Sequence, residues 1–281
     1  MLAANGLEGM LRPVLQQATG PAVAGLLIGA FFPAVVLQGI VACHLIAFFT
    51  MLRLSKQIDA ADPALEPPLP SSVWADLAEG VRFTIKTPWL FATLLWAVCI
   101  VFLFVGPFEV LTPFIMRDEL GLGAESFGLL LAIFGAGSAI GSLFMASVSL
   151  PRRYLSVMVA AWGFTMAPLA WFGFASHFWE LAVIGFIVGA GGGIGQVIWG
   201  TLLQRRVPLR MLGRISSLDF FVSLALMPIS MALAGPLSTV VDNNVIFLVI
   251  GIATPVISVI AWLAARMWED EIAHPLDTAV A

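Results

Sequence analysis

Long apolar runs separated by short polar segments dominate this chain. Eight of them reach the roughly 20 residues that a helix needs to cross a bilayer. They lie at residues 13–32, 34–54, 89–115, 126–150, 155–175, 178–202, 219–241 and 245–266. Within a membrane only helices and closed barrels satisfy their backbone groups, and these runs lack the alternating hydrophobicity of barrel strands. The pattern therefore predicts an all-α, polytopic bundle of eight transmembrane helices.

The longest polar segment, residues 55–88, leaves two predicted spans before it and six after it. Its first part has the composition of a linker, with prolines at Pro63, Pro67, Pro68 and Pro70. Residues 72–86 then predict an amphipathic helix, because apolar residues recur every fourth position, at Val73, Leu77, Val81 and Ile85. We expect this helix to lie on the membrane surface. A binding site for a regulatory partner is the alternative.

Positive charges fix the predicted orientation. Of the 13 Lys and Arg residues, Arg117 alone falls on one side of the predicted membrane. The other twelve fall on the opposite side, at Arg12, Arg53, Lys56, Arg82, Lys86, Arg152, Arg153, Arg205, Arg206, Arg210, Arg214 and Arg266. Cytoplasmic loops carry the excess of Lys and Arg. Both termini are therefore predicted to be cytoplasmic.

Composition agrees with a lipid environment and narrows the function classes. The chain is 60% hydrophobic and 11% charged, against about 25% charged residues in soluble domains. A net charge of −4 gives no reason to expect nucleic acid as a partner. Cys43 and Cys99 both lie in apolar runs and predict neither a disulfide nor a metal site. We expect no enzyme, no cofactor and no metal, since no cluster of catalytic residues is present; a membrane-embedded enzyme is the weakest alternative.

Small residues recur at helical spacing in three predicted spans. Pairs and stripes four residues apart occur at Gly25 and Gly29, at Gly137 and Gly141, at Gly185, Gly189 and Gly193, and at Gly191 and Gly195. Such spacing predicts close packing of helices; a smooth contact along which helices rock is the functional alternative. Prolines inside spans predict kinks, at Pro21, Pro107, Pro113, Pro168, Pro228, Pro236 and Pro255.

Glu109 is the leading candidate for a functional polar residue. It lies inside the third span, about six residues before its outer end and just after Gly106 and Pro107. Burial penalises the negative charge of a carboxyl group, which suits reversible proton binding. The alternative is a hydrated carboxylate near the outer interface that has no function.

Other polar residues in the spans are weaker candidates. His44 lies near the centre of the second span, where a titrating imidazole or a neutral one bonded to a neighbouring helix is possible, and Gln38 ranks below it. Gln196 and Trp199 share a face of the sixth span, where they would line a cavity or join helices. Asp219, at the predicted start of the seventh span, is expected to pair with an arginine or to cap the helix.

Residues 2–25, 141–154 and 203–218 carry a resemblance to a known family. The chain is similar to the major facilitator superfamily, and within it to the bacterial exporter branch of enterobactin-exporter-like and macrolide-efflux-like proteins. In the first segment, Gly20, Pro21 and Gly25 match part of a motif associated with antiporters. The second and third segments resemble basic cytoplasmic loops of that branch, with arginines at Arg152, Arg153, Arg205, Arg206 and Arg214.

The resemblance implies a domain organisation. The eight spans would be helices five to twelve of a twelve-helix fold. Residues 1–54 would be the last two helices of the N-terminal half, 55–88 the cytoplasmic linker, 89–266 the six-helix C-terminal half and 267–281 a cytoplasmic tail. Helices one to four would be absent, for which a truncated gene or a misplaced start is the simplest hypothesis.

The resemblance also implies a function. We expect an exporter of small amphipathic molecules, of drug or siderophore type, in the bacterial inner membrane, working by alternating access and driven by protons. Glu109 would couple or bind, Gln196 and Trp199 would line the cavity, and the loop arginines would be gate residues or only topology signals. The rival expectation is a non-transporting membrane protein, either an inactive remnant or one that binds a partner transporter.

Overall fold

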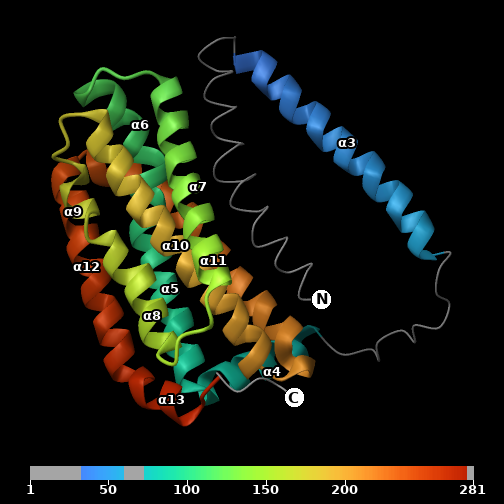
Figure 1. Ribbon diagram of the computed structural model, residues 1–281. Coiled ribbons are helices and arrows are strands. Elements are labelled where there is room, and N and C mark those ends of the chain that lie inside the picture. Colours follow the sequence, from blue (N-terminus) through green and yellow to red (C-terminus); the bar gives the residue numbers. More distant parts are fainter. Residues whose placement is uncertain (1–32, 60–72, 277–281) are drawn as a thin grey trace.

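The computed structural model describes residues 33–59 and 73–276, and in that part of the chain every regular element is helical (Figure 1). The spans and their neighbours are α3 (Pro33–Asp59), α4 (Val73–Lys86), α5 (Pro88–Gly106), α7 (Ala124–Ser147), α10 (Phe178–Arg206), α11 (Leu209–Ser238) and α12 (Asn243–Ala264). The shorter helices are η2 (Pro107–Leu111), α6 (Thr112–Phe114), η3 (Ile115–Glu119), α8 (Tyr154–Gly163), η4 (Phe164–Met166), α9 (Leu169–Phe172) and α13 (Met267–Ala273).

Six helical segments of the described chain are long and apolar enough to cross a membrane. They are Pro88–Glu119, Ala124–Ser147, Tyr154–Phe172, Phe178–Arg206, Leu209–Ser238 and Asn243–Ala264. The third to eighth predicted spans are thus found as helices. The first predicted span, 13–32, lies outside the described residues. The second falls in α3, where the apolar helix Leu37–Arg53 is shorter than these six; the structure therefore supports six spans and leaves eight as a prediction.

Two helix boundaries differ from those predicted. The segment between residues 202 and 219 was expected to be a loop because four arginines interrupt its apolar pattern. Instead α10 continues to Arg206 and α11 begins at Leu209, so only Val207 and Pro208 remain between them. Proline lacks the backbone N–H that would continue a helix, so the chain turns here. Asp219 consequently lies about three turns inside α11 and does not cap it.

Glycines bring α7 and α10 into direct backbone contact. A Cβ added at Gly137 or Gly141 would collide with backbone oxygens of α10, and one at Gly189 or Gly193 with backbone oxygens of α7. The adjacent stripe faces another helix: Gly191 packs against Ala161 and Thr165, and Gly195 against Trp162, all in α8 and the turn after it. Both glycine stripes therefore pack helices closely, as predicted. α10 lies between α7 and α8 for this reason.

Prolines interrupt two of the spans. After α5, Pro107 removes a backbone donor and the chain passes through η2 and η3, two turns of π-helix, before the span ends at Glu119. In the third described span, η4 and Pro168 separate α8 from α9. Pro228, Pro236 and Pro255 lie within the continuous helices α11 and α12. Among the prolines that the structure describes, the predicted disturbances are thus found at Pro107, Pro113 and Pro168, whereas Pro21 lies outside the described residues.

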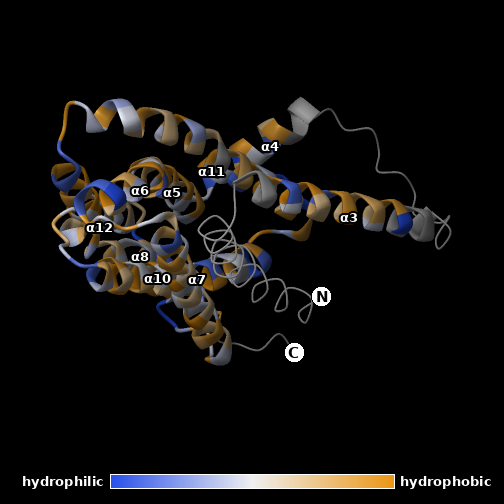
Figure 2. Ribbon diagram, turned by 90° about the horizontal axis from the view of Figure 1, so that it is seen from above, coloured by the Kyte–Doolittle hydropathy of each residue, from blue (hydrophilic) through white to orange (hydrophobic). Residues whose placement is uncertain are grey.

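Aromatic side chains form two groups in the core. One group contains phenyl rings: Phe172 stacks on Phe247 at 4.6 Å between ring centres and lies 6.0 Å from Phe108. The other contains the indoles of Trp89, Trp96, Trp162 and Trp199. Many large apolar side chains are exposed on the helices, among them Phe144, Val249 and Ile260, and hydrophobic colours dominate the helix ribbons in Figure 2. A bundle with an apolar outside suits lipid as its solvent.

Candidate functional site

Glu109 lies in η2, the π-helical turn that follows α5. The turn is attached to α11 at the preceding residue, because Gly106 N donates to Ser230 Oγ at 2.8 Å and Ser230 Oγ donates to the carbonyl of Phe102 at 2.6 Å. Glycine is required at 106, since a Cβ there would collide with the Ser230 backbone. The side chain of Glu109 itself is exposed on the bundle surface. A carboxyl group inside an apolar span is thus held next to a helix–helix contact.

Trp199, in the second half of α10, is fixed among other indoles. Its side chain is 4% exposed. Its ring centre lies 6.3 Å from that of Trp89 on α5 and 6.4 Å from that of Trp162 on α8. Trp162 in turn lies 5.7 Å from Trp96, whose Nε1 donates to Ser258 Oγ of α12 at 2.8 Å. The four indoles therefore connect α5, α8, α10 and α12 in the interior of the bundle.

Asp219 is the polar partner of this cluster. Trp199 Nε1 donates to Asp219 Oδ2 at 3.0 Å, which joins α10 to α11. The predicted arginine partner is replaced by an indole. Together with Glu109, Asp219 is an acidic residue that lies within a described span and away from its ends. Acidic residues at such positions are costly and often mark functional sites.

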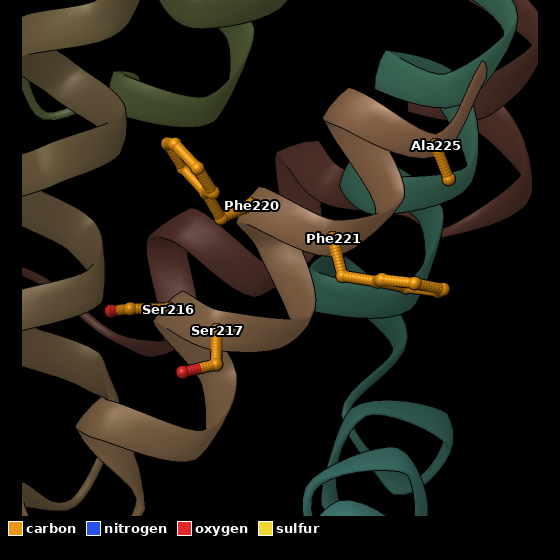
Figure 3. A pocket seen from close by; sticks show the side chains of 5 residues that line it. All are labelled: Ser216, Ser217, Phe220, Phe221 and Ala225. Atoms are coloured by element: carbon orange, nitrogen blue, oxygen red, sulfur yellow. The ribbon is translucent and has the colours of Figure 1, made fainter.

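A recess lies on the exposed face of α11, and Asp219 is not among its lining residues. Its volume is about 620 Å³, and its lining residues are Ser216, Ser217, Phe220, Phe221 and Ala225 (Figure 3). Ser216 and Phe220 point to one side of the helix, and Phe221 and Ala225 to the other. We call it the α11 recess.

The remaining polar candidates are not brought together. Gln196 is exposed on α10, whereas Trp199, predicted to share a cavity with it, is buried. His44 and Gln38 are exposed on α3, which stands apart from the bundle in Figure 1. His44 Nδ1 lies 2.9 Å from the carbonyl of Ile40 on its own helix. The antiporter-like residues Gly20, Pro21 and Gly25 lie outside the described residues.

The loop arginines gather at the end of the bundle that carries α4 and α13 (Figure 1). Arg153 Nη1 lies 3.5 Å from Glu271 Oε1, and Arg206 pairs with Asp270; both acids belong to α13. Arg206 also lies over the ring of Trp89, 4.5 Å from its centre. Two further arginines bind other partners: Arg205 donates to the carbonyl of Leu276 at 2.8 Å, and Arg214 pairs with Glu79 of α4 at 2.5 Å. Arg152 is exposed between α7 and α8.

Glu271 is the buried centre of that end. It is 1% exposed and accepts hydrogen bonds from the backbone N of Ser156 at 3.0 Å and from Ser156 Oγ at 2.7 Å. Tyr154 adds a bond from its hydroxyl to the carbonyl of His274 at 2.9 Å. The segment expected to be a simple tail thus begins with a docked helix. Arg266, with a left-handed φ of 47°, makes the sharp turn between α12 and α13.

A sequence model of the Major Facilitator Superfamily matches residues 4–223 and, in a second alignment, residues 108–279. The six membrane-length helices of the described chain, and the gathering of the loop arginines at one end of the bundle, agree with that match. The chain therefore belongs to the Major Facilitator Superfamily, and it is a multi-pass membrane protein. The overlap of the two alignments is what a fold built from repeated halves would produce.

Two curated relatives are similar over nearly the whole chain. The MFS-type transporter y4rN of Sinorhizobium fredii is 27% identical over 265 residues, covering 93% of this chain and 62% of the relative. The multidrug efflux pump Tap of Mycolicibacterium fortuitum is 27% identical over 265 residues, covering 90% of this chain and 61% of the relative. The chain thus spans about three fifths of the length of these two relatives.

The sequence did not predict three features of the site. The bond between Trp199 and Asp219 was not predicted, although the two residues are only 20 positions apart and are joined by a helix end, a two-residue turn and a helix start. The docking of α13 could have been predicted from its two adjacent acids, Asp270 and Glu271, because acids expected on the same side of the membrane as basic loops can form ion pairs with them. The α11 recess had no sequence signal other than two adjacent phenylalanines.

Proposed function

We propose that this chain exports small amphipathic molecules across the bacterial inner membrane by alternating access, coupled to protons. The observation that carries the proposal is Glu109, a carboxyl group exposed in an apolar span at a π-helical turn. Acidic residues at such places mark ion pathways and proton relays, and π-helical turns are frequent at functional sites. Membership of a transporter family and similarity to an efflux pump support export as the activity.

Glu109 would carry the proton. Its protonation removes a charge from an apolar span, which favours a different packing from that of the ionised form. The turn that bears it is bonded to α11 through Gly106 and Ser230, so a change at Glu109 acts directly on the contact between α5 and α11. A helix contact that responds to protonation is the element that coupling requires. The glycine contact between α7 and α10 supplies a smooth surface for such rearrangement.

The basic end of the bundle would face the cytoplasm, as the positive-inside rule requires. At that end, α4 packs against α11 through Gly80 and leaves an apolar stripe exposed, at Leu77, Val81 and Ile85. We infer that this stripe lies on the membrane surface. Arg153 and Arg206 both bind α13, which belongs to the same bundle as they do. This favours a role in stabilising that bundle over a role as a gate between the two halves of the transporter. In this proposal residues 89–266 form one half and residues 1–54 contribute to the other.

The proposal is tested by export from proteoliposomes that contain the purified chain. Ethidium, an amphipathic cation, and Nile red, a neutral amphipathic dye, serve as probes, and a pH gradient is imposed. We expect gradient-driven movement of at least one probe, lost in Glu109→Gln and kept in Glu125→Gln. Glu125 is a matched control because it is exposed at the start of α7, outside the apolar part of the spans. Unchanged gradient dependence in Glu109→Gln would remove Glu109 from the mechanism, and no movement of either probe would favour a non-transporting membrane protein.

A further inference from the structure

Helix α4 presents three different faces around its axis, and the first packs on the bundle. Gly80 and Thr84 are buried on this face, and a Cβ added at Gly80 would lie 3.6 Å from the Cβ of Arg214 on α11. Glu79 holds α4 at the same place through its ion pair with Arg214. The helix is therefore attached to the bundle along one side and leaves its other sides open.

The second face is the apolar stripe of Leu77, Val81 and Ile85. These side chains are 43%, 37% and 60% exposed. They are four residues apart, so they follow one line along the helix. Only Thr87 separates α4 from α5, with which the first membrane-length segment of the described chain begins. The connection holds the stripe at the boundary of the membrane, where apolar side chains enter the acyl layer.

The third face carries two cations, Arg82 and Lys86. Each directly follows a residue of the apolar stripe and so lies about 100° further round the helix. Both side chains are exposed, and among the described residues neither has an ion-pair or hydrogen-bond partner. Glu79, three residues before Arg82, is already paired with Arg214. This edge of α4 therefore presents an uncompensated positive charge beside the apolar stripe.

We propose that α4 binds anionic phospholipids of the cytoplasmic leaflet, with their phosphate groups at Arg82 and Lys86 and their acyl chains against the apolar stripe. Cations beside such a stripe reach the headgroup level when the stripe enters the acyl layer. Anionic headgroups attract them there. A free phosphate ion would pair with the two cations but leave the stripe in water, so a lipid is the ligand that fits both faces. This binding goes beyond the proposed export and does not depend on it.

Native mass spectrometry of the full chain in detergent tests the proposal. The probes are phosphatidylglycerol, which is anionic, and phosphatidylcholine, which is zwitterionic, with identical acyl chains and in equal amounts. We expect the wild-type chain to prefer phosphatidylglycerol. Arg82→Gln and Lys86→Gln should each weaken its binding about fivefold, and the double variant about twentyfold, with phosphatidylcholine unaffected.

Two further variants separate charge from apolar contact. Arg82→Lys keeps the cation and should keep the preference for phosphatidylglycerol. Val81→Ser removes part of the apolar stripe and should weaken both lipids alike. Bound lipid also stabilises the folded chain, so phosphatidylglycerol should raise the Tm of the wild-type chain more than phosphatidylcholine does. The double variant should lose this difference.

The control is Arg266→Gln. Arg266 is an exposed cation at the same basic end, in the turn between α12 and α13 and outside α4. Its replacement should leave the lipid preference unchanged. An equal loss in Arg266→Gln, or the wild-type preference in the double variant, would overturn the proposal. Displacement of phosphatidylglycerol by inorganic phosphate at the same concentration would also overturn it, because the ligand would then be a free anion.

Lipid binding is measured without transport, so the two proposals fail separately. A preference for phosphatidylglycerol that depends on Arg82 and Lys86, in a chain that exports neither dye, would refute the proposed function and leave the lipid site standing. Export by a chain without that preference would refute the lipid site alone.

Discussion

Neighbouring glycines in α10 offer a controlled perturbation of the helix packing. A Cβ at Gly193 would collide with the backbone oxygen of Ser138 and lie 2.8 Å from Ser142 Oγ, both on α7. A Cβ at Gly192 meets nothing within 4 Å. Gly193→Ala and Gly192→Ala make the same chemical change in the same helix. They therefore share the gain in helix propensity, up to about 1 kcal/mol, and differ only in packing.

The difference between the two variants isolates the packing term. Overpacking by one methyl group in a close contact costs about 1–3 kcal/mol. Each kcal/mol shifts Tm by about 2–4 °C in a protein of 150–250 residues, so Gly193→Ala should unfold roughly 2–12 °C below Gly192→Ala. Thermal unfolding in detergent, followed by tryptophan fluorescence and circular dichroism, measures this gap. Equal Tm values for the two variants would refute the close backbone contact between α7 and α10.

Two further predictions concern the basic end. Glu271→Ala removes buried hydrogen bonds to a charged group and should lower the free energy of unfolding by about 1.5–3 kcal/mol. The control Glu269→Ala breaks an exposed pair with Arg266 and should lower it by about 0–1 kcal/mol. Equal losses in the two variants would contradict the docking of α13. The orientation is tested with single cysteines that replace Arg117 or Arg152 in a chain lacking Cys43 and Cys99. In intact cells an impermeant maleimide should label position 117 and leave position 152 unlabelled. The opposite labelling pattern would contradict the proposed topology.

The apolar pattern predicted the helices better than it predicted their contacts. The close packing at the glycine stripes of α10 was predictable, because the spacing of glycines along one helix decides where the backbone of another helix can approach it. The amphipathic helix at 72–86 corresponds to α4, since a four-residue repeat is a local property. The start of α11 at Leu209 does not follow from the apolar pattern, because arginines interrupt that pattern there. A helix nevertheless continues beyond its apolar part when its charges have partners, as Arg214 has in Glu79.

The candidate site was only partly predictable. Glu109 stood out as an acid in an apolar run, but its π-helical turn and the contact between Gly106 and Ser230 depend on packing between α5 and α11. Trp199 was singled out, yet its pairing with Asp219 required the position of two helices relative to each other. Residues close in the fold but separated by a turn of unknown geometry cannot be paired from spacing alone.

The most direct test of the central claim is proton movement during export. Proteoliposomes with a pH-sensitive dye in the lumen and the wild-type chain in the membrane are given ethidium on one side, and both fluxes are followed together. The account predicts that ethidium and protons move in opposite directions, that a protonophore stops net export, and that Glu109→Gln uncouples the two. Ethidium movement with no change in lumenal pH and no response to the protonophore would contradict proton-coupled export.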